Sequence, residues 1–247
     1  MKIEGIVFDI NGTLADIRTD EGDEEIYRAI SHFLTYQGIY LHRGEVRDAY
    51  YRIMDQQRKS CGEQYPEFDA VEVWREFLRQ YSANVSIPKE KQKHMPCFLA
   101  EMYRGISRTR LQLYPDVKEV LRELQPRFQL AAVSDGQSVW AMPEMKALGI
   151  DSYFSTVIIS GDCGFRKPDR RLFEAALAGL RLAPENVLFV GNDMYRDIFG
   201  AQQMGMKTVF FSSNQGKKEM DGVAPDYIIY QFAELRNAIR FFEDQQI

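Results

Sequence analysis

The sequence predicts an α/β protein: a doubly wound, Rossmann-like parallel sheet carrying an inserted, all-helical cap. Short apolar segments rich in β-branched and aromatic residues recur along the chain, and most are followed by a helix-like stretch. One long interval near the N-terminus contains only helical patterns. Continuous apolar runs are typical of strands buried on both faces, and their alternation with helices indicates parallel βαβ crossovers.

The core strands are predicted from these apolar runs. The first run lies at the N-terminus and the others fall in the second half of the chain, so the core is discontinuous in sequence. The predicted strands are Ile3–Phe8, Phe128–Val133, Thr156–Ile159, Val187–Val190, Thr208–Phe211 and Asp226–Ile229.

The interval from Ala15 to Tyr114 has apolar residues at three-to-four spacing, as amphipathic helices do, and no comparable β run. We therefore expect residues 15–114 to form a helical cap domain, and residues 1–14 and 115–247 to form the core. Tyr114-Pro115-Asp116-Val117 predicts the start of the helix that leads back into the core. The predicted cap helices are Glu24–Gln37, Arg43–Lys59, Ala70–Tyr81 and Glu90–Ile106.

Composition excludes several classes of protein. The 247 residues suffice for a core domain with a large insert, and 45% hydrophobic with 27% charged residues is typical of a globular protein. A net charge of −5 argues against a broad nucleic-acid surface, and no apolar run is long enough to span a membrane. The three cysteines lack zinc-site spacing. With acidic residues where a signal peptide needs apolar ones, we expect a cytoplasmic protein without nucleic-acid or membrane partners.

Four polar clusters follow predicted strands. The carboxyl ends of parallel strands meet at one edge of a sheet, so these clusters are expected to share one site. Carboxylates, a lysine and a hydroxyl suit phosphoryl transfer assisted by a hard cation such as magnesium, which prefers oxygen ligands. The clusters are Asp9-Ile10-Asn11-Gly12-Thr13-Leu14, Ser134-Asp135-Gly136, Arg166-Lys167-Pro168 and Gly191-Asn192-Asp193-Met194-Tyr195-Arg196-Asp197.

These clusters resemble the four motifs of the haloacid dehalogenase superfamily. FDINGTL, VSDG, RKPD and VGNDMYRDIFGA occur in the family's order and separation, and they span the core but not the cap. The resemblance implies a magnesium-dependent phosphatase that acts on a small phosphorylated metabolite through an aspartyl-phosphate intermediate. In this family a helical insert after the first motif closes over the site and selects the substrate, and both monomers and homodimers fit the resemblance.

The resemblance also assigns roles to residues. Asp9 would be the nucleophile and a magnesium ligand, and Lys167 would pair with it and with the developing phosphoryl charge. Thr13 would support the turn behind Asp9, and Ser134 would bind the phosphoryl oxygens with the help of its neighbours. Those neighbours in the substrate-binding set are Asp135 and Gly136, and the further metal-site residues are Asn11, Asn192, Asp193 and Asp197. A simple alternative for Asp197 is that it caps a helix over residues 197–204.

Two positions depart from the phosphatase pattern. Asn11 stands where the family usually has an aspartate that protonates the leaving alcohol, and an amide can neither give nor take that proton. Losing such a group typically costs about 10² to 10⁴-fold in rate. Asn192 also stands where an aspartate is usual, and the sequence leaves open whether it or Asp193 binds the metal.

Four explanations of Asn11 compete. The enzyme could act on esters with good leaving groups or use another acid, for which Asp135 and Asp16 are candidates. The sequence could carry an Asp-to-Asn change made to trap a complex. The chain could be a 2-haloacid dehalogenase, although that branch has a tyrosine at position 11. It could also be a weakly catalytic binding or regulatory protein.

Basic residues of the cap are candidates for substrate selection, although each could equally lie on a solvated helix face. Any of them could meet an anionic group, and the sequence does not identify the substrate. They are His42, Arg43, Arg47, Arg52, Arg58 and Lys59.

Overall fold

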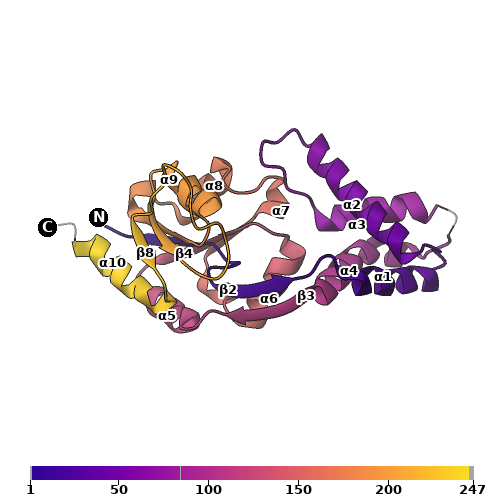
Figure 1. The fold of residues 1–247 in the computed structure, drawn as a ribbon, viewed down its shortest axis with the longest axis horizontal. Helices are drawn as coiled ribbons and strands as arrows, with labels where there is room; N and C mark the ends of the chain where they lie inside the picture. Colours follow the sequence, from indigo (N-terminus) through magenta and orange to yellow (C-terminus); the bar gives the residue numbers. More distant parts are fainter. Residues whose placement is uncertain (1, 84, 245–247) are drawn as a thin grey trace.

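Six parallel strands form the central sheet of the core in the computed structural model, which describes residues 2–83 and 85–244 (Figure 1). Their order is β5-β4-β1-β6-β7-β8, which places the N-terminal strand in the middle of the sheet. The predicted α/β fold class is confirmed, and a strand lies at each predicted position. The strands are β1 (Gly5–Phe8), β4 (Gln129–Ser134), β5 (Thr156–Ile159), β6 (Val187–Gly191), β7 (Lys207–Phe211) and β8 (Tyr227–Ile229).

Both faces of this sheet are covered by helices. Ile6 and Phe8 of β1 pack into one apolar cluster, whereas Val7 between them packs into another on the opposite face. This alternation explains why the core strands are apolar without interruption. The first face is covered by α5 (Val117–Leu124), α6 (Ser138–Leu148) and α10 (Leu235–Asp244), and the second by α8 (Arg170–Leu180) and α9 (Gly200–Gln202).

Four helices form the cap at the far end of the molecule from the chain termini (Figure 1). Each starts close to its predicted position, because a polar side chain caps its first turn in three of the four cases. Asp23, His42 and Asp69 accept hydrogen bonds from the first backbone N–H groups of their helices. The helices are α1 (Glu24–Tyr36), α2 (Arg43–Ser60), α3 (Ala70–Tyr81) and α4 (Lys89–Ser107).

A two-stranded ribbon joins the cap to the core and corrects one expectation. Strands β2 (Ala15–Thr19) and β3 (Arg108–Leu113) pair antiparallel, whereas the interval 15–114 was expected to hold no strand. The ribbon has no continuous apolar run because charged side chains lie along it, as in the ion pair between Asp16 and Arg110 at 2.7 Å. The domain boundaries at residues 14/15 and 114/115 stay a prediction.

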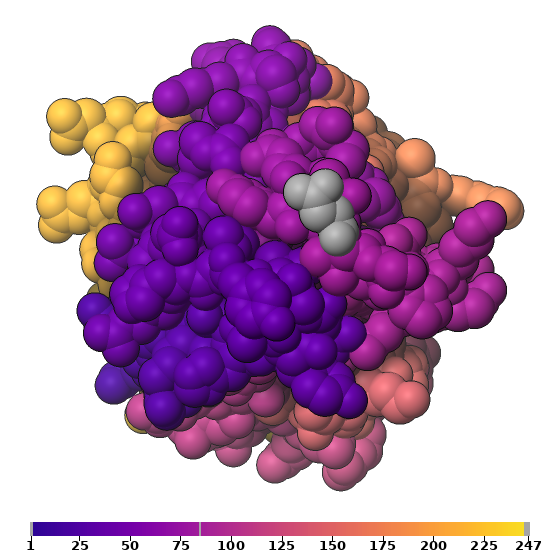
Figure 2. Space-filling view, turned by 90° about the vertical axis from the view of Figure 1, so that its right-hand side faces the viewer, coloured from indigo at the N-terminus to yellow at the C-terminus, as the bar shows by residue number. Residues whose placement is uncertain are grey.

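The cap and the core meet at α6. Trp140 of α6 belongs to the apolar cluster of the cap, and its ring nitrogen donates to the carbonyl of Ala100 at 2.8 Å. One turn later, Glu144 accepts hydrogen bonds from the guanidinium groups of Arg104, at 2.7 and 3.2 Å, and Arg108, at 3.1 Å. Figure 2, which looks onto the cap end, shows this face formed mainly by residues of the first half of the chain.

The remaining helical segments are short. They are α7 (Ser160–Cys163), the 3-10 turns η1 (Asp151–Tyr153), η2 (Pro184–Asn186) and η4 (Phe232–Glu234), and the π-helical segment η3 (Met194–Phe199). Over residues 2–83 and 85–244, no helix is both long and apolar enough to cross a bilayer.

We predict that Glu144→Ala destabilises the protein by about 3 kcal/mol, because it leaves the nearly buried guanidinium of Arg104 without its partner. The free energy of unfolding from urea denaturation measures this. Glu243→Ala is the matched control, since its pair with Arg127 is exposed and is expected to contribute less than about 1 kcal/mol. Equal losses in the two variants would contradict the prediction.

Candidate active site

Asp9 is the first residue after the central strand β1. Its backbone N–H donates to the carbonyl of Val190 in β6, which fixes the carboxylate at the carboxyl end of the sheet. The chain then turns tightly at Gly12, whose φ of +89° lies in the left-handed region. A Cβ at this glycine would also come within 2.2 Å of the Asn192 side chain, so the turn brings the first and fourth motifs into direct contact.

Lys167 lies at the centre of the site and is 3% exposed. Its ammonium donates to Oδ1 of Asp9 at 2.7 Å and to Oδ1 of Asp197 at 2.5 Å. Burial alone would lower the pKa of Lys167, but the carboxylates of Asp197 and Asp9 outweigh it and raise this pKa above its ordinary value. The lysine is therefore a fixed cation between two carboxylates from different strand ends.

Thr13 connects the nucleophile candidate to the fourth motif. Its hydroxyl donates to Oδ2 of Asp9 at 2.8 Å and lies 3.2 Å from Oδ1 of Asn192. Both oxygens of Asp9 thus have a polar neighbour, one from Lys167 and one from Thr13. The geometry therefore orients the Asp9 carboxylate before any substrate binds.

Asp197 is buried and binds the backbone of the fourth motif. Its Oδ2 accepts hydrogen bonds from the backbone N–H groups of Asn192 and Asp193, both at 3.0 Å. Burial raises the pKa of Asp197 to about 6, although Lys167 acts in the opposite direction. Asp197 is not a helix cap: the helical segment begins earlier, at Met194, and Asp193 caps it.

The carboxylate of Asp193 is occupied by groups other than Asp9. Its carboxylate accepts from the backbone N–H groups of Tyr195, Arg196 and Lys217, at 2.8 to 3.0 Å, and from the Arg196 guanidinium at 2.9 and 3.1 Å. Burial opposes its ionisation, but the donors from Arg196 and Lys217 outweigh burial and lower its pKa. The geometry therefore favours Asn192 over Asp193 as the group beside Asp9, because every oxygen of Asp193 is already engaged.

The second motif supplies an unpaired hydroxyl. Ser134 is fully buried and, among the described residues, its Oγ has no hydrogen-bond partner. Oδ1 of Asp135 accepts from the backbone N–H of Lys167 at 2.9 Å. Asp135 therefore positions residues 164–168, the loop that carries Lys167, which we call the lysine loop. The backbone N–H of Gly136 donates to the hydroxyl of Ser160 at 2.9 Å and is therefore already engaged.

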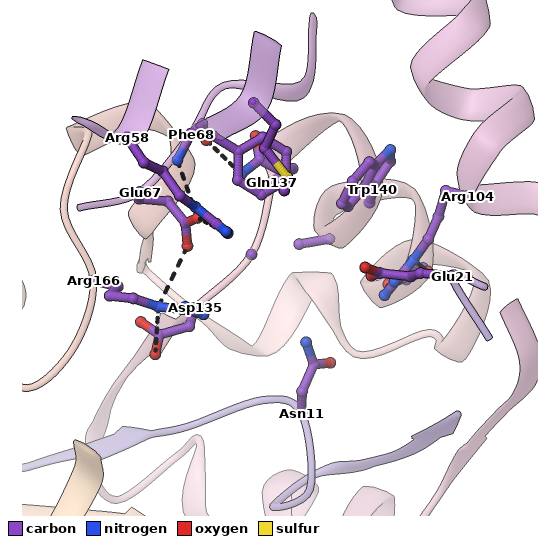
Figure 3. Close-up of a pocket in the computed structure, with 14 residues that line it drawn as sticks. Asn11, Glu21, Arg58, Glu67, Phe68, Arg104, Asp135, Gln137, Trp140 and Arg166 are labelled. Atoms are coloured by element: carbon purple, nitrogen blue, oxygen red, sulfur yellow. Dashed lines mark hydrogen bonds and ion pairs between the residues drawn. The ribbon is translucent and has the colours of Figure 1, made fainter. Parts of the chain in front are cut away.

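A cavity of about 270 Å³ lies between the cap and the core, and Asn11 forms part of its wall (Figure 3). Arg58, Glu67 and Phe68 reach it from the cap and its loop, whereas Arg166 and Gln137 reach it from the core. Arg58 was already a candidate from the cap sequence, whereas Glu67, Phe68 and Gln137 had no local signal, because they meet the site only through contacts between distant segments. Tyr50 of α2 is 1% exposed and packs inside the cap rather than lining the cavity.

Loop 61–69 of the cap binds directly to the core beside this cavity. Pro66 and Phe165 form an antiparallel bridge, and the N–H of Glu67 donates to the carbonyl of Gly164 at 2.9 Å. The amide of Gln137 donates to the Phe68 carbonyl at 2.6 Å and accepts from the N–H of Ala70 at 2.9 Å. The cavity wall is therefore built jointly by both parts of the chain.

The donor atoms around Asp9 fit a hard cation in type. The Asp9 carboxylate and the Asn192 amide oxygen lie on either side of the Thr13 hydroxyl. Within the described residues, no three His, Cys, Asp or Glu side chains form a complete metal cage. Magnesium commonly takes only one or two carboxylates from protein and completes its shell with water and substrate phosphate, so this donor set fits it.

Comparison with known proteins identifies the family. The family model of the haloacid dehalogenase-like hydrolases matches residues 3–205. The chain therefore belongs to the haloacid dehalogenase-like hydrolases, as its four motifs predicted.

Named relatives are similar to this chain over different lengths. Glyceraldehyde 3-phosphate phosphatase of Methanopyrus kandleri is 29% identical over 245 residues, which cover 96% of this chain and 97% of that protein. The enzyme of the same name from Pyrococcus furiosus is 31% identical over 143 residues, and the match spans only 59% of its length and 57% of this chain. A crystal structure of 2-haloacid dehalogenase from Pseudomonas syringae superposes with a TM-score of 0.71 at 20% identity, covering 97% of this chain and 99% of that one. At that identity the likeness shows the fold alone.

We predict that Lys167→Met destabilises the protein by about 3 to 5 kcal/mol, because it leaves the buried carboxylates of Asp9 and Asp197 without a counter-charge. Chemical denaturation followed by circular dichroism measures the loss. Lys207→Met serves as the control, since its partner Asp226 and its own side chain are partly exposed, and less than about 1 kcal/mol is expected. A Lys167→Met variant as stable as this control would show that the two carboxylates do not need the lysine.

Proposed function

We propose that this chain is a magnesium-dependent phosphatase that hydrolyses a small phosphorylated metabolite through an aspartyl-phosphate on Asp9. The observation that carries the proposal is the position of Asp9: its carboxylate is held by Lys167 and Thr13, and Ser134, whose hydroxyl is unpaired, ends the neighbouring strand β4. Relatives named glyceraldehyde 3-phosphate phosphatase support the same class of substrate. The cytoplasm is the compartment we propose, and the three free cysteines are consistent with it.

In the first half of the reaction, a carboxylate oxygen of Asp9 attacks phosphorus and the bond from phosphorus to the ester oxygen breaks. The ester oxygen leaves as an alkoxide that takes a proton from water, since Asn11 cannot donate one, and the phosphoryl group stays on Asp9 as a mixed anhydride. Lys167 and Ser134 stabilise the charge on the phosphoryl oxygens, because they are fixed before the reaction begins. In the second half, water attacks phosphorus and releases phosphate and free Asp9.

Asp9, Asn192 and the backbone carbonyl of Asn11 are the groups we assign to magnesium. When bound there, the cation neutralises part of the phosphate charge. Thr13 keeps the side chains of Asp9 and Asn192 in place for this, since its hydroxyl lies close to both. Asp197 contributes indirectly, by binding Lys167 and the N–H groups of the turn that carries Asn192.

We predict that p-nitrophenyl phosphate and acetyl phosphate are hydrolysed in the presence of Mg²⁺ and not after chelation with EDTA. Asp9→Asn is expected to lower turnover by more than about 10⁴-fold, because it removes the nucleophile. Phosphate release measures both effects. Chloride release from a 2-haloacid without metal would replace the proposal with a dehalogenase, and tight metabolite binding without either activity would favour a regulatory protein.

We predict that Asn11→Asp raises turnover of alkyl phosphates at least about tenfold, because a carboxylate at this position can protonate the leaving alcohol. The effect on acetyl phosphate should be much smaller, since its leaving group needs no proton. Steady-state rates on both esters test the difference. Asn11→Gln keeps an amide at this position and serves as the control.

Equal rates for the wild type and Asn11→Asp would mean that another side chain supplies the proton. Asp16 is buried and bound by Arg110 and Gln215, which removes it from consideration. Among the described carboxylates that line the cavity, Glu21 alone has no ion pair, so Glu21→Gln would be the next variant to measure.

A further inference from the structure

Unpaired polar atoms gather around the cavity between the cap and the core. Among the described residues eight buried side-chain atoms lack a hydrogen-bond partner, and four of them belong to Arg58, Ser134, Asp135 and Arg166. Three of these residues line the cavity, and Ser134 directly precedes one of them. Buried polar groups in folded proteins nearly always have a partner, so a cluster of groups without a protein partner beside a cavity is available to water or to a polar ligand.

The two arginines share a single carboxylate. Glu67 lies between them, with Oε1 at 3.6 Å from Nη2 of Arg58 and Oε2 at 3.7 Å from Nε of Arg166. These separations are ion pairs but too long for hydrogen bonds. The oxygens of Glu67 instead accept hydrogen bonds from the hydroxyl of Ser160 at 2.9 Å and the N–H of Phe68 at 3.1 Å.

Asp135 does not accept a hydrogen bond from Arg166 either. Its Oδ2 lies 3.8 Å from Nε of Arg166 and 3.8 Å from the guanidinium of Arg196, and neither separation is a hydrogen bond. The remaining oxygen of Asp135 is used by the N–H of Lys167. Arg58 and Arg166 therefore keep donors that no described protein group accepts.

Arg104, the third arginine that lines the cavity, differs from the other two because its guanidinium donors are paired with a carboxylate. Two of its nitrogens donate to the two oxygens of Glu144, at 2.7 and 3.2 Å. In Figure 3 this arginine lies beside Glu21 on one side of the cavity, whereas Arg58, Glu67 and Arg166 lie on the other, with Asn11 beneath. The guanidinium donors without a hydrogen-bond acceptor are therefore on the side formed by Arg58 and Arg166.

We propose that the substrate is a small phosphate monoester that carries a second anionic group, a carboxylate or another phosphate, bound by Arg58 and Arg166. This inference rests on the proposed phosphatase function, which places the reacting phosphate at Asp9. A guanidinium presents several N–H donors in a plane and matches both kinds of anion. Arg58 belongs to α2 of the cap and Arg166 to the core, so the bound anion joins the two parts over the site.

Two matched pairs of substrates test the proposal on the full chain with Mg²⁺. The first pair is 3-phosphoglycerate and glycerol 3-phosphate, which differ in a carboxylate. The second is ribulose 1,5-bisphosphate and ribulose 5-phosphate, which differ in a phosphate. We expect kcat/KM to favour the doubly anionic member of at least one pair by about tenfold or more, as charge-assisted hydrogen bonds do. The pair with the larger ratio identifies the second group.

A ratio near one in both pairs, with all four esters hydrolysed, would overturn this inference and leave the phosphatase proposal intact. If neither the four phosphate esters nor acetyl phosphate, an acyl phosphate, were hydrolysed, the phosphatase proposal would be overturned and this inference with it.

Variants of Arg58 give a second, independent test. Arg58→Met should lower the ratio within the favoured pair by about tenfold or more, and Arg58→Lys should fall between it and the wild type because it keeps the charge but loses the planar fork. Because the ratio compares two substrates of one preparation, a smaller folded fraction does not change it. Arg52→Met is the matched control: this arginine lies on the same helix, donates to Gln80 at 2.8 Å and does not line the cavity. A ratio in Arg58→Met equal to that in Arg52→Met would contradict the assignment.

Discussion

A single buried ammonium holds the site together. Lys167 is the cation between Asp9, which follows the central strand β1, and Asp197, which lies in the segment after the neighbouring strand β6. A buried carboxylate is costly without a counter-charge, so the fold must deliver all three side chains to the same place. The sheet order does this for the two carboxylates, because β1 and β6 are adjacent and parallel and their carboxyl ends coincide, and the loop after β5 brings in Lys167. Asp197 then extends the constraint to the backbone of Asn192 and Asp193, and the turn at Gly12 leaves room for the Asn192 side chain, which a Cβ at that position would meet.

The cap depends on the core in a different way. Trp140 contributes an apolar side chain from α6 to the cap cluster, and Glu144 on the same helix neutralises two arginines from the cap side. Loop 61–69 adds backbone hydrogen bonds to the lysine loop. The lysine loop thus carries both Lys167 and the contacts to the cap. Because Lys167 binds Asp9, we expect a movement of the cap to shift the position of Lys167 relative to Asp9. A lid that is built into the catalytic loop in this way can exclude water and position the substrate in one step.

The sequence was most informative where one physical rule decides the structure. Parallel strands buried on both faces must be apolar throughout, and the run GIVF at β1 was therefore recognisable. Capped, periodic helices such as α3 were equally clear. The ribbon of β2 and β3 was not recognisable from sequence. A short pair of strands with charged side chains has no pattern that distinguishes it from a helix or a loop.

The site shows the same division between local and long-range information. Asp9, Lys167 and Ser134 were located because strand ends meet at one edge of the sheet. Which of Asn192 and Asp193 faces Asp9 was undecidable from sequence, since neighbouring residues point to opposite sides and only the contacts of Arg196 and Lys217 reveal the direction. The contact between Glu67 and Ser160 joins residues 93 positions apart, and no local pattern predicts such a pair.

The two amides of the site, Asn11 and Asn192, bear on what the enzyme can bind as well as on what it can catalyse. The motif resemblance implies a carboxylate at each position, and an amide there gives the site less negative charge where, on the proposed function, a phosphate dianion approaches. The single positive charge of Lys167 is shared between Asp9, Asp197 and, on the proposed function, the phosphoryl oxygens. A second anionic group held by Arg58 and Arg166 would supply binding energy remote from phosphorus, and such energy can be used to position the reacting phosphate against Asp9. On the proposed function, Asn11 contributes little to proton transfer. The unpaired donors of Arg58 and Arg166 would offset this loss, because they position the substrate by charge.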